Sequence, residues 1–290
     1  MKATLHNQRR GSADHNDRNF DISAVKDHHI DPERIHENIY SSYKNIRPFE
    51  EAERTFYTDS YSEWVETQNK KYLEHREPKK LKTIDKLLFG RHTKPKEMIL
   101  QIGKSNIHPD KEIFADCVLE FVKSLAPYAQ NLHVIDVAIH NDEETPHAHI
   151  RSVWDYIDEN GIRKISQEKG LKQLGFELPD PEQAESRYNN RNMIFQDEVR
   201  QKWYDICEEH GIEIDRSPIP GNQQHLEKNE LTLKMQADQI KAQEEQIRIL
   251  DAEIAAKQEQ LLRLERELRE KEEQQKTKQK MLEAILAKEK

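Results

Sequence analysis

An apolar run that leads into a histidine-rich loop constrains the fold of this chain more than any other feature. Residues 134–139 are apolar apart from one aspartate, which predicts a strand that is buried on both faces and therefore central in its sheet. Residues 141–146 favour turns, and Pro146 can begin a strand because no ladder hydrogen bond is lost there. We therefore expect a β-hairpin around this loop.

Three histidines occupy the two ends of this hairpin. His140 ends the first strand, and His147 and His149 begin the second. Side chains two apart in a strand share a face, and pairing across the hairpin sets His140 opposite His147. Three imidazoles that leave coordination positions open are typical of a catalytic metal site. The alternative is a solvated loop with scattered histidines, which a lone His-x-His pair would favour.

Two stretches carry a resemblance to a known family. Residues 140–149 read H-N-D-E-E-T-P-H-A-H, which resembles the H-x-D-E-x-T-P-H-x-H signature of the MobV (Mob/Pre) plasmid mobilisation relaxases. These belong to the HUH superfamily of single-strand DNA endonucleases. Residues 15–18 read H-N-D-R and are similar to the family's first motif. The resemblance covers roughly residues 12–155 and weakens through 160–220.

The resemblance implies a fold and a chemistry. The fold is α+β, an HUH-type antiparallel sheet flanked by helices. The activity is metal-dependent, strand-specific nicking and rejoining of DNA at an origin of transfer. His15 is then the nucleophile that forms a phosphohistidine with the 5′-phosphate, and Arg18 orients it or holds a phosphate. Glu143 is the general acid or base, although spacing alone does not separate it from Asp142.

The cofactor implied by the resemblance is manganese or magnesium, bound by His140, His147 and His149. Three imidazoles by themselves also suit zinc or another first-row metal.

Three alternatives stay open on the sequence. His6 heads a second tetrad, H-N-Q-R, and is another candidate nucleophile. An HUH replication initiator would instead use a tyrosine, for which Tyr188 and Tyr204 are the candidates. A non-catalytic coiled-coil DNA-binding adaptor with a structural metal is the reading from a different class.

Charge restricts where DNA could bind. The net charge of −9 argues against a non-specific nucleic-acid binder. Residues 70–96 are nevertheless basic, which predicts a local patch for the DNA backbone, with solvated helix faces as the plain alternative. The candidate DNA contacts are Tyr43, Lys79, Lys80, Lys82, Arg187 and Arg191.

The remaining pattern predicts two domains. Helices are expected over residues 49–75, 111–128, 166–174 and 185–211, and a strand over 98–103; together they complete a relaxase domain of residues 1–221. Residues 222–290 carry a leucine and isoleucine heptad whose second seam is weak, so the tail is either a dimerising coiled coil or a single solvated helix.

The two cysteines form no disulfide framework, and no apolar run is long enough for a membrane span. We therefore expect a cytoplasmic protein that does not bind membranes.

Overall fold

The computed structural model describes residues 1–8, 11–21, 30–104 and 106–217, together with isolated positions between 241 and 276. Its contacts divide the chain into two units, Met1–Arg216 and Ser217–Lys290. The predicted boundary at residue 221 and most of the predicted coiled coil lie outside the described residues and stay predictions.

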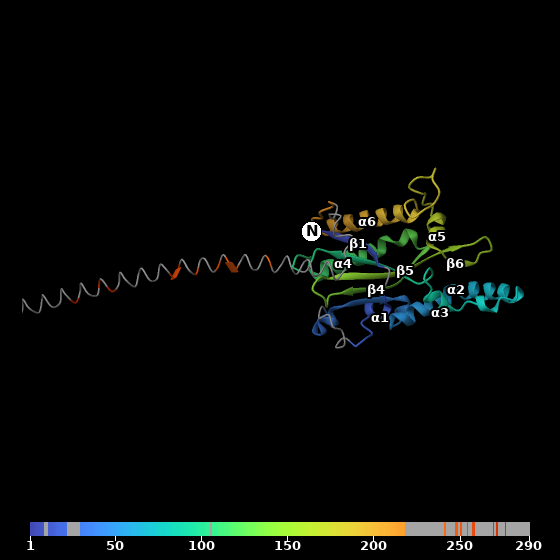
Figure 1. Ribbon diagram of the computed structural model, residues 1–290, viewed down its shortest axis with the longest axis horizontal. Coiled ribbons are helices and arrows are strands. Elements are labelled where there is room, and N and C mark those ends of the chain that lie inside the picture. Colours follow the sequence, from blue (N-terminus) through green and yellow to red (C-terminus); the bar gives the residue numbers. More distant parts are fainter. Residues whose placement is uncertain are drawn as a thin grey trace, which may run out of the picture. The chain divides into compact units, whose positions relative to one another are not determined.

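A six-stranded antiparallel sheet forms the centre of the first unit (Figure 1). Four of its strands run in the order β1-β3-β5-β4, with β2 beyond β4 and β6 paired to β5. Their bounds are β1 (Ala3–Gln8), β2 (Ile39–Ser42), β3 (Lys96–Ile102), β4 (Leu132–His140), β5 (His147–Ile157) and β6 (Arg163–Ile165). The predicted hairpin is β4 and β5. The strand predicted to be central is β4, and it pairs with β5 on one side and β2 on the other, which confirms its place inside the sheet.

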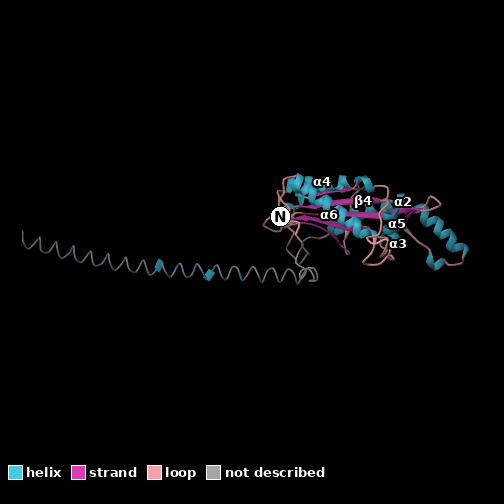
Figure 2. Cartoon of the chain, turned by 90° about the horizontal axis from the view of Figure 1, so that it is seen from above, coloured by secondary structure: helices cyan, strands magenta, loops and turns pink. Residues whose placement is uncertain are grey.

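Helices cover both faces of this sheet. On one face lie α4 (Lys111–Ser124), α5 (Gln167–Gln173) and α6 (Arg191–Glu209), and on the other α1 (Ala13–Asn16), α2 (Phe49–Glu74) and α3 (Ile84–Leu88). Figure 1 shows α6 above the strands and α1, α2 and α3 below them, and Figure 2 shows the same layers from above. The structure confirms the predicted α+β class with helices flanking an antiparallel sheet.

Strand alternation sends the two sets of β5 side chains into different surroundings. Ala148, Ile150 and Trp154 point to the face of α4 and α6 and join the main core there. Arg151 and Val153 point to the face of α2, as the period of two predicts. One face of β5 therefore packs the core, while the opposite face carries the histidines.

Some predicted bounds differ from the structure. The helix expected over 185–211 begins only at Arg191, because Ser186 and Asn189 form a β-bridge and the Asn189 amide donates to loop carbonyls. Ile113 and Leu119 of α4 are exposed. The inward side of that helix is filled by Phe114, Cys117, Val118 and Phe121.

The two cysteines, unrelated in sequence, meet in the core. Cys117 on α4 and Cys207 on α6 are both buried and free, and their thiols hydrogen-bond each other. They therefore belong to the α4–α6 packing. Among the described residues, no helix is both long and apolar enough to cross a membrane.

A buried group of charges joins α2 to the sheet next to the histidines. The Arg151 guanidinium pairs with Glu53 of α2, and Asp136 lies 4.0 Å from it. Burial, followed by the charge of Glu53, raises the pKa of Asp136 well above its usual value. The folded protein therefore holds a proton at Asp136 that the unfolded chain releases near pH 4.

The raised pKa of Asp136 leads to a prediction for the variant Asp136→Asn. A raised folded pKa means that wild-type stability falls as pH rises from about 4 towards that pKa. The asparagine variant lacks this loss, so its free energy of unfolding should exceed that of the wild type at pH 8, and the difference should shrink towards pH 4. Urea unfolding over this range measures it, and a difference independent of pH would contradict the assignment.

Candidate active site

The β4–β5 hairpin brings the three predicted histidines together. His140 is the direct cross-strand partner of His147, and His149 pairs with Ala138 one step further along. The ring centroids of His140 and His147 are 5.1 Å apart, and each lies 4.9 Å from the ring of His149. All three rings project from the sheet face that α1 and α2 cover.

Hydrogen bonds fix which ring nitrogens of His140 and His147 face inwards. The Nε2 atom of His140 lies 2.7 Å from the Asn16 carbonyl, and Nδ1 of His147 lies 3.0 Å from the Thr145 carbonyl. A carbonyl only accepts, so each of these nitrogens carries the proton and the other nitrogen of each ring holds a lone pair. Those two acceptor nitrogens, Nδ1 of His140 and Nε2 of His147, are 3.4 Å apart.

The third ring, His149, is held in the same way, with a carboxylate as the acceptor in place of a carbonyl. Nδ1 of His149 lies 3.1 Å from Oε1 of Glu97, and Nε2 of His149 is buried without a hydrogen-bond partner. Three lone pairs, each backed by an acceptor on the far side of its ring, are the arrangement that holds a cation. The donor set therefore fits a divalent metal.

Glu97 is a site residue that sequence reasoning missed. It is 1% exposed, accepts a hydrogen bond of 2.6 Å from the Asn16 amide, and so joins α1 to His149. Burial raises its pKa, against the opposing effect of Asn16. A side chain at Gly11 would put its Cβ 2.1 Å from Oε2 of Glu97, so the Glu97 carboxylate would have to move. The available signal was an acid directly before the apolar residues of β3.

His15 lies beside the three imidazoles, on the short helix α1. Its ring centroid is 5.9 Å from that of His140 and 5.7 Å from that of His149. Burial, and then the charge of Arg18, lowers the pKa of His15, which keeps this imidazole neutral at neutral pH. Its lone pair is therefore available for nucleophilic attack or for metal binding.

Potential ligand atoms meet in two overlapping groups. His15, His140 and His149 form one, and His140, Glu143 and His147 form the other, with all ligand atoms of a group within 4.8 Å of one another. The two groups share His140. Each group therefore joins two of the three hairpin histidines to either His15 or Glu143.

Arg18 connects the first motif, residues 15–18, to the hairpin loop, residues 141–146. Its guanidinium makes two hydrogen bonds to the carboxylate of Asp142, of 2.8 and 2.7 Å, and one of 2.9 Å to Glu143. The remaining nitrogen donates to the His15 carbonyl at 3.2 Å. Arg18 adopts φ of 58°, a left-handed conformation that is uncommon for residues other than glycine.

The two acids of the loop differ in their surroundings. Asp142 is fully buried and both of its oxygens are held by Arg18. The Glu143 side chain is 15% exposed, and its Oε1 lies 3.8 Å from Nε2 of His147. Geometry therefore favours Glu143 over Asp142 as the acid that can exchange protons with a substrate.

Of the three alternative nucleophiles, His6 alone lies near this cluster. His6 is on the same sheet face, but Ile99 of β3 lies between its strand and His149. Tyr204 belongs to α6 and Tyr188 to the loop before it, and α6 packs on the opposite face of the sheet. The sheet itself therefore separates both tyrosines from the histidines.

Several predicted DNA contacts are engaged elsewhere. The Tyr43 hydroxyl donates to Asp59 and its ring packs on Phe56. Arg191 has a side chain only 12% exposed, and it pairs with Glu168. Tyr43 and Arg191 therefore already have partners within the fold, whereas Arg187 and Lys79 are exposed.

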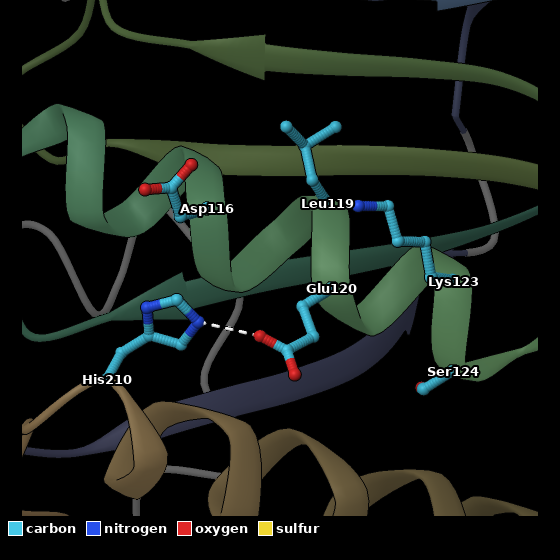
Figure 3. A pocket seen from close by; sticks show the side chains of 6 residues that line it. All are labelled: Asp116, Leu119, Glu120, Lys123, Ser124 and His210. Atoms are coloured by element: carbon cyan, nitrogen blue, oxygen red, sulfur yellow. Dashed lines mark hydrogen bonds and ion pairs between the residues drawn. The ribbon is translucent and has the colours of Figure 1, made fainter.

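A pocket on the other side of the molecule lies along α4 and the end of α6 (Figure 3). His210 binds Glu120 across it at 2.8 Å. Its lining is Asp116, Leu119, Glu120, Lys123, Ser124 and His210. None of the site histidines reaches this pocket, so it takes no part in the site.

The buried ion pair between Arg18 and Asp142 leads to a prediction for the variant Arg18→Met. Removing one partner of a buried charge pair leaves the other uncompensated, which costs about 3–5 kcal/mol of stability. Urea unfolding should show this loss, and adding Asp142→Asn should recover part of it. The control Arg200→Met breaks an exposed pair with Asp197 and should cost less than about 1 kcal/mol. Equal losses in the two single variants would contradict the prediction.

Comparison with known proteins closes the description of the site. No protein-family model and no curated protein matches the chain. A manganese-bound structure of the MobM relaxase domain (MOBV; Mob_Pre) on plasmid pMV158 oriT DNA is similar over 81% of this chain and 100% of that one, at 16% identity and a TM-score of 0.49.

Two further structures are similar. A second manganese-bound MobM complex, at pH 5.5, gives 15% identity, the same coverage and a TM-score of 0.48. A structure described as the molecular basis of vancomycin resistance transfer in Staphylococcus aureus covers 43% of this chain and 58% of that one, at 20% identity and a TM-score of 0.26. The MobM domain is of the family that the two histidine motifs of this chain resemble.

Proposed function

We propose that this chain is a relaxase of the MobV type, which nicks and rejoins one DNA strand at an origin of transfer. One observation carries the proposal: the rings of His140, His147 and His149 lie within 5.1 Å of one another, and a fourth, neutral imidazole lies beside them. The residues that do this are the two motifs whose sequence resembles that family. Such a site suits attack on a phosphodiester.

His140, His147 and His149 would hold a divalent cation. When bound, it supplies positive charge that stabilises the phosphate as charge builds up during attack. Their nitrogen ligands suit manganese or another first-row metal better than magnesium, while the family resemblance implies manganese or magnesium.

His15 is proposed as the nucleophile. One of its ring nitrogens attacks phosphorus, the bond from phosphorus to the 3′-oxygen breaks, and a nitrogen–phosphorus bond to the 5′ side forms. The proton from the other ring nitrogen ends on the 3′-oxygen, which leaves as a hydroxyl. Glu143, next to His147 and Arg18, is proposed to relay it. The phosphohistidine keeps the bond energy, so the reverse reaction rejoins the strand.

Arg18 is proposed to position the reacting groups. Its donors are taken by Asp142, Glu143 and the His15 carbonyl, which favours an orienting role over direct phosphate binding. We further propose residues 1–221 as the nuclease domain and 222–290 as a helical tail that pairs two copies; each remains to be tested.

The nucleophile can be tested with a 3′-labelled pool of random single-stranded DNA and manganese. Wild-type protein should retain label in a denaturing gel, and acid should release it because nitrogen–phosphorus bonds are acid-labile. His15→Ala should retain no detectable label. Tyr188→Phe and Tyr204→Phe should behave as wild type. Loss of the adduct in either tyrosine variant, with His15→Ala still active, would favour the replication-initiator alternative.

Metal binding provides a second test, through Glu97→Gln. This carboxylate accepts the Nδ1 proton of His149, and the loss of such a partner lowers metal affinity by about 10- to 100-fold. Calorimetric titration with manganese measures it, and the exposed Glu177→Gln serves as the control. Unchanged affinity in Glu97→Gln would contradict the proposed ligand geometry.

A further inference from the structure

Basic residues gather in one segment of an otherwise acidic chain. Residues 70–96, here called the basic arm, hold ten lysines and arginines against three acids, in a chain whose net charge is −9. The arm consists of the end of α2, a 3-10 turn (Pro78–Lys80), α3 and the loop that leads to β3. Its excess positive charge must therefore act locally.

The arm projects from the body of the fold. The buried residues of α2 end at Trp64 and Val65 still packs against the core, so the last nine residues of the helix lie beyond it. Beyond the helix the chain folds back along it, and Asn69 holds Lys82 through hydrogen bonds of 2.9 and 2.8 Å. In Figure 1 the cyan end of α2 is the part of the described chain farthest to the right.

The charges at the tip of the arm are available to a ligand. Lys70, Lys71, Arg76 and Lys79 are exposed, and within the described part of the chain none of them forms an ion pair. Other basic residues of the arm are used internally. Lys80 pairs with Glu77 at 2.7 Å, and the Lys82 ammonium lies 4.4 Å from the centre of the Trp64 ring.

The arm and the candidate active site are the two ends of one rigid element. The first backbone amide of α2, at Phe49, donates to the Asp17 carboxylate at 2.7 Å, next to Arg18. A helix of 26 residues is about 39 Å long. That length corresponds to about 11 base pairs of duplex at 3.4 Å each.

We propose that the basic arm docks on the phosphate backbone of duplex DNA, about one helical turn from the strand that the histidines receive. This rests on the proposed function. A duplex fits better than a single strand, because single-strand binding depends on exposed aromatic rings that stack on bases. In residues 70–96, all of which the structure describes, Phe89 is the one exposed Phe, Tyr or Trp. Exposed lysines on a helix instead make backbone contacts that ignore sequence.

The test compares two charge-matched variants of the full-length chain. The arm variant is Lys71→Gln, Arg76→Gln, Lys79→Gln. The control variant is Lys104→Gln, Lys123→Gln, Lys172→Gln, at exposed positions outside the arm. Binding to a mixed-sequence duplex of about 20 base pairs, long enough to exceed the span of α2, is measured by fluorescence anisotropy from 50 to 200 mM salt, on the scale set by counterion release.

The arm variant should bind the duplex roughly tenfold more weakly than the control variant, with a salt slope reduced by about 3 because three phosphate contacts are lost. Its adduct with the single-stranded pool should match the wild type. Equal duplex binding by the two variants would overturn the proposal. The proposal would also be overturned if wild-type protein did not bind the duplex but bound vesicles of phosphatidylserine and phosphatidylcholine. If wild-type protein forms no adduct at all, the proposed nuclease function fails, while the duplex comparison still decides the role of the arm.

Discussion

A buried guanidinium holds the candidate active site together. Arg18 is 8% exposed, and it grips a fully buried carboxylate, Asp142, that lies 124 positions away in the sequence. Charges at this depth are costly unless each is matched, so the pair specifies one docking of α1 against the hairpin loop. The same guanidinium also contacts Glu143 and the His15 carbonyl. The position of the proposed nucleophile therefore depends on this one cation.

The sheet supplies the rigidity that the histidines need. Ala148, Ile150 and Trp154 of β5 pack into a core that also contains Phe195 and Trp203. Close-packed interiors yield little, so the residues between them, His147 and His149, are fixed in direction by the opposite face. Glu97 adds the same control on the neighbouring strand, where it sets the tautomer of His149.

Local rules predicted the hairpin but not its surroundings. The pairing of His140 with His147, and the shared face of His147 and His149, follow from strand alternation, which neighbouring residues alone determine. The approach of His15 was expected only through a family resemblance, because a contact between distant segments leaves no periodic signal. Glu97 was missed for that reason, since its importance comes from two partners on other elements.

Polar composition was a poor guide to which side chains are free. Tyr43 and Arg191 were both expected to contact DNA, yet one packs beside Phe56 and the other pairs with Glu168. Sequence shows that a side chain carries charge or an aromatic ring, but only the fold shows whether a partner already uses it. The helical pattern of α2 continues beyond the sheet, so the sequence does not show that the buried residues of this helix end at Trp64.

The bond from the Phe49 amide to Asp17 has a consequence for how such a protein can diversify. Substitutions at the distal end of α2 leave the histidine cluster untouched, because the proximal end alone is attached to it. The proposed DNA-docking end and the proposed reaction centre can then change separately, so that descendants of one ancestor could bind different DNA while their histidine clusters stay the same.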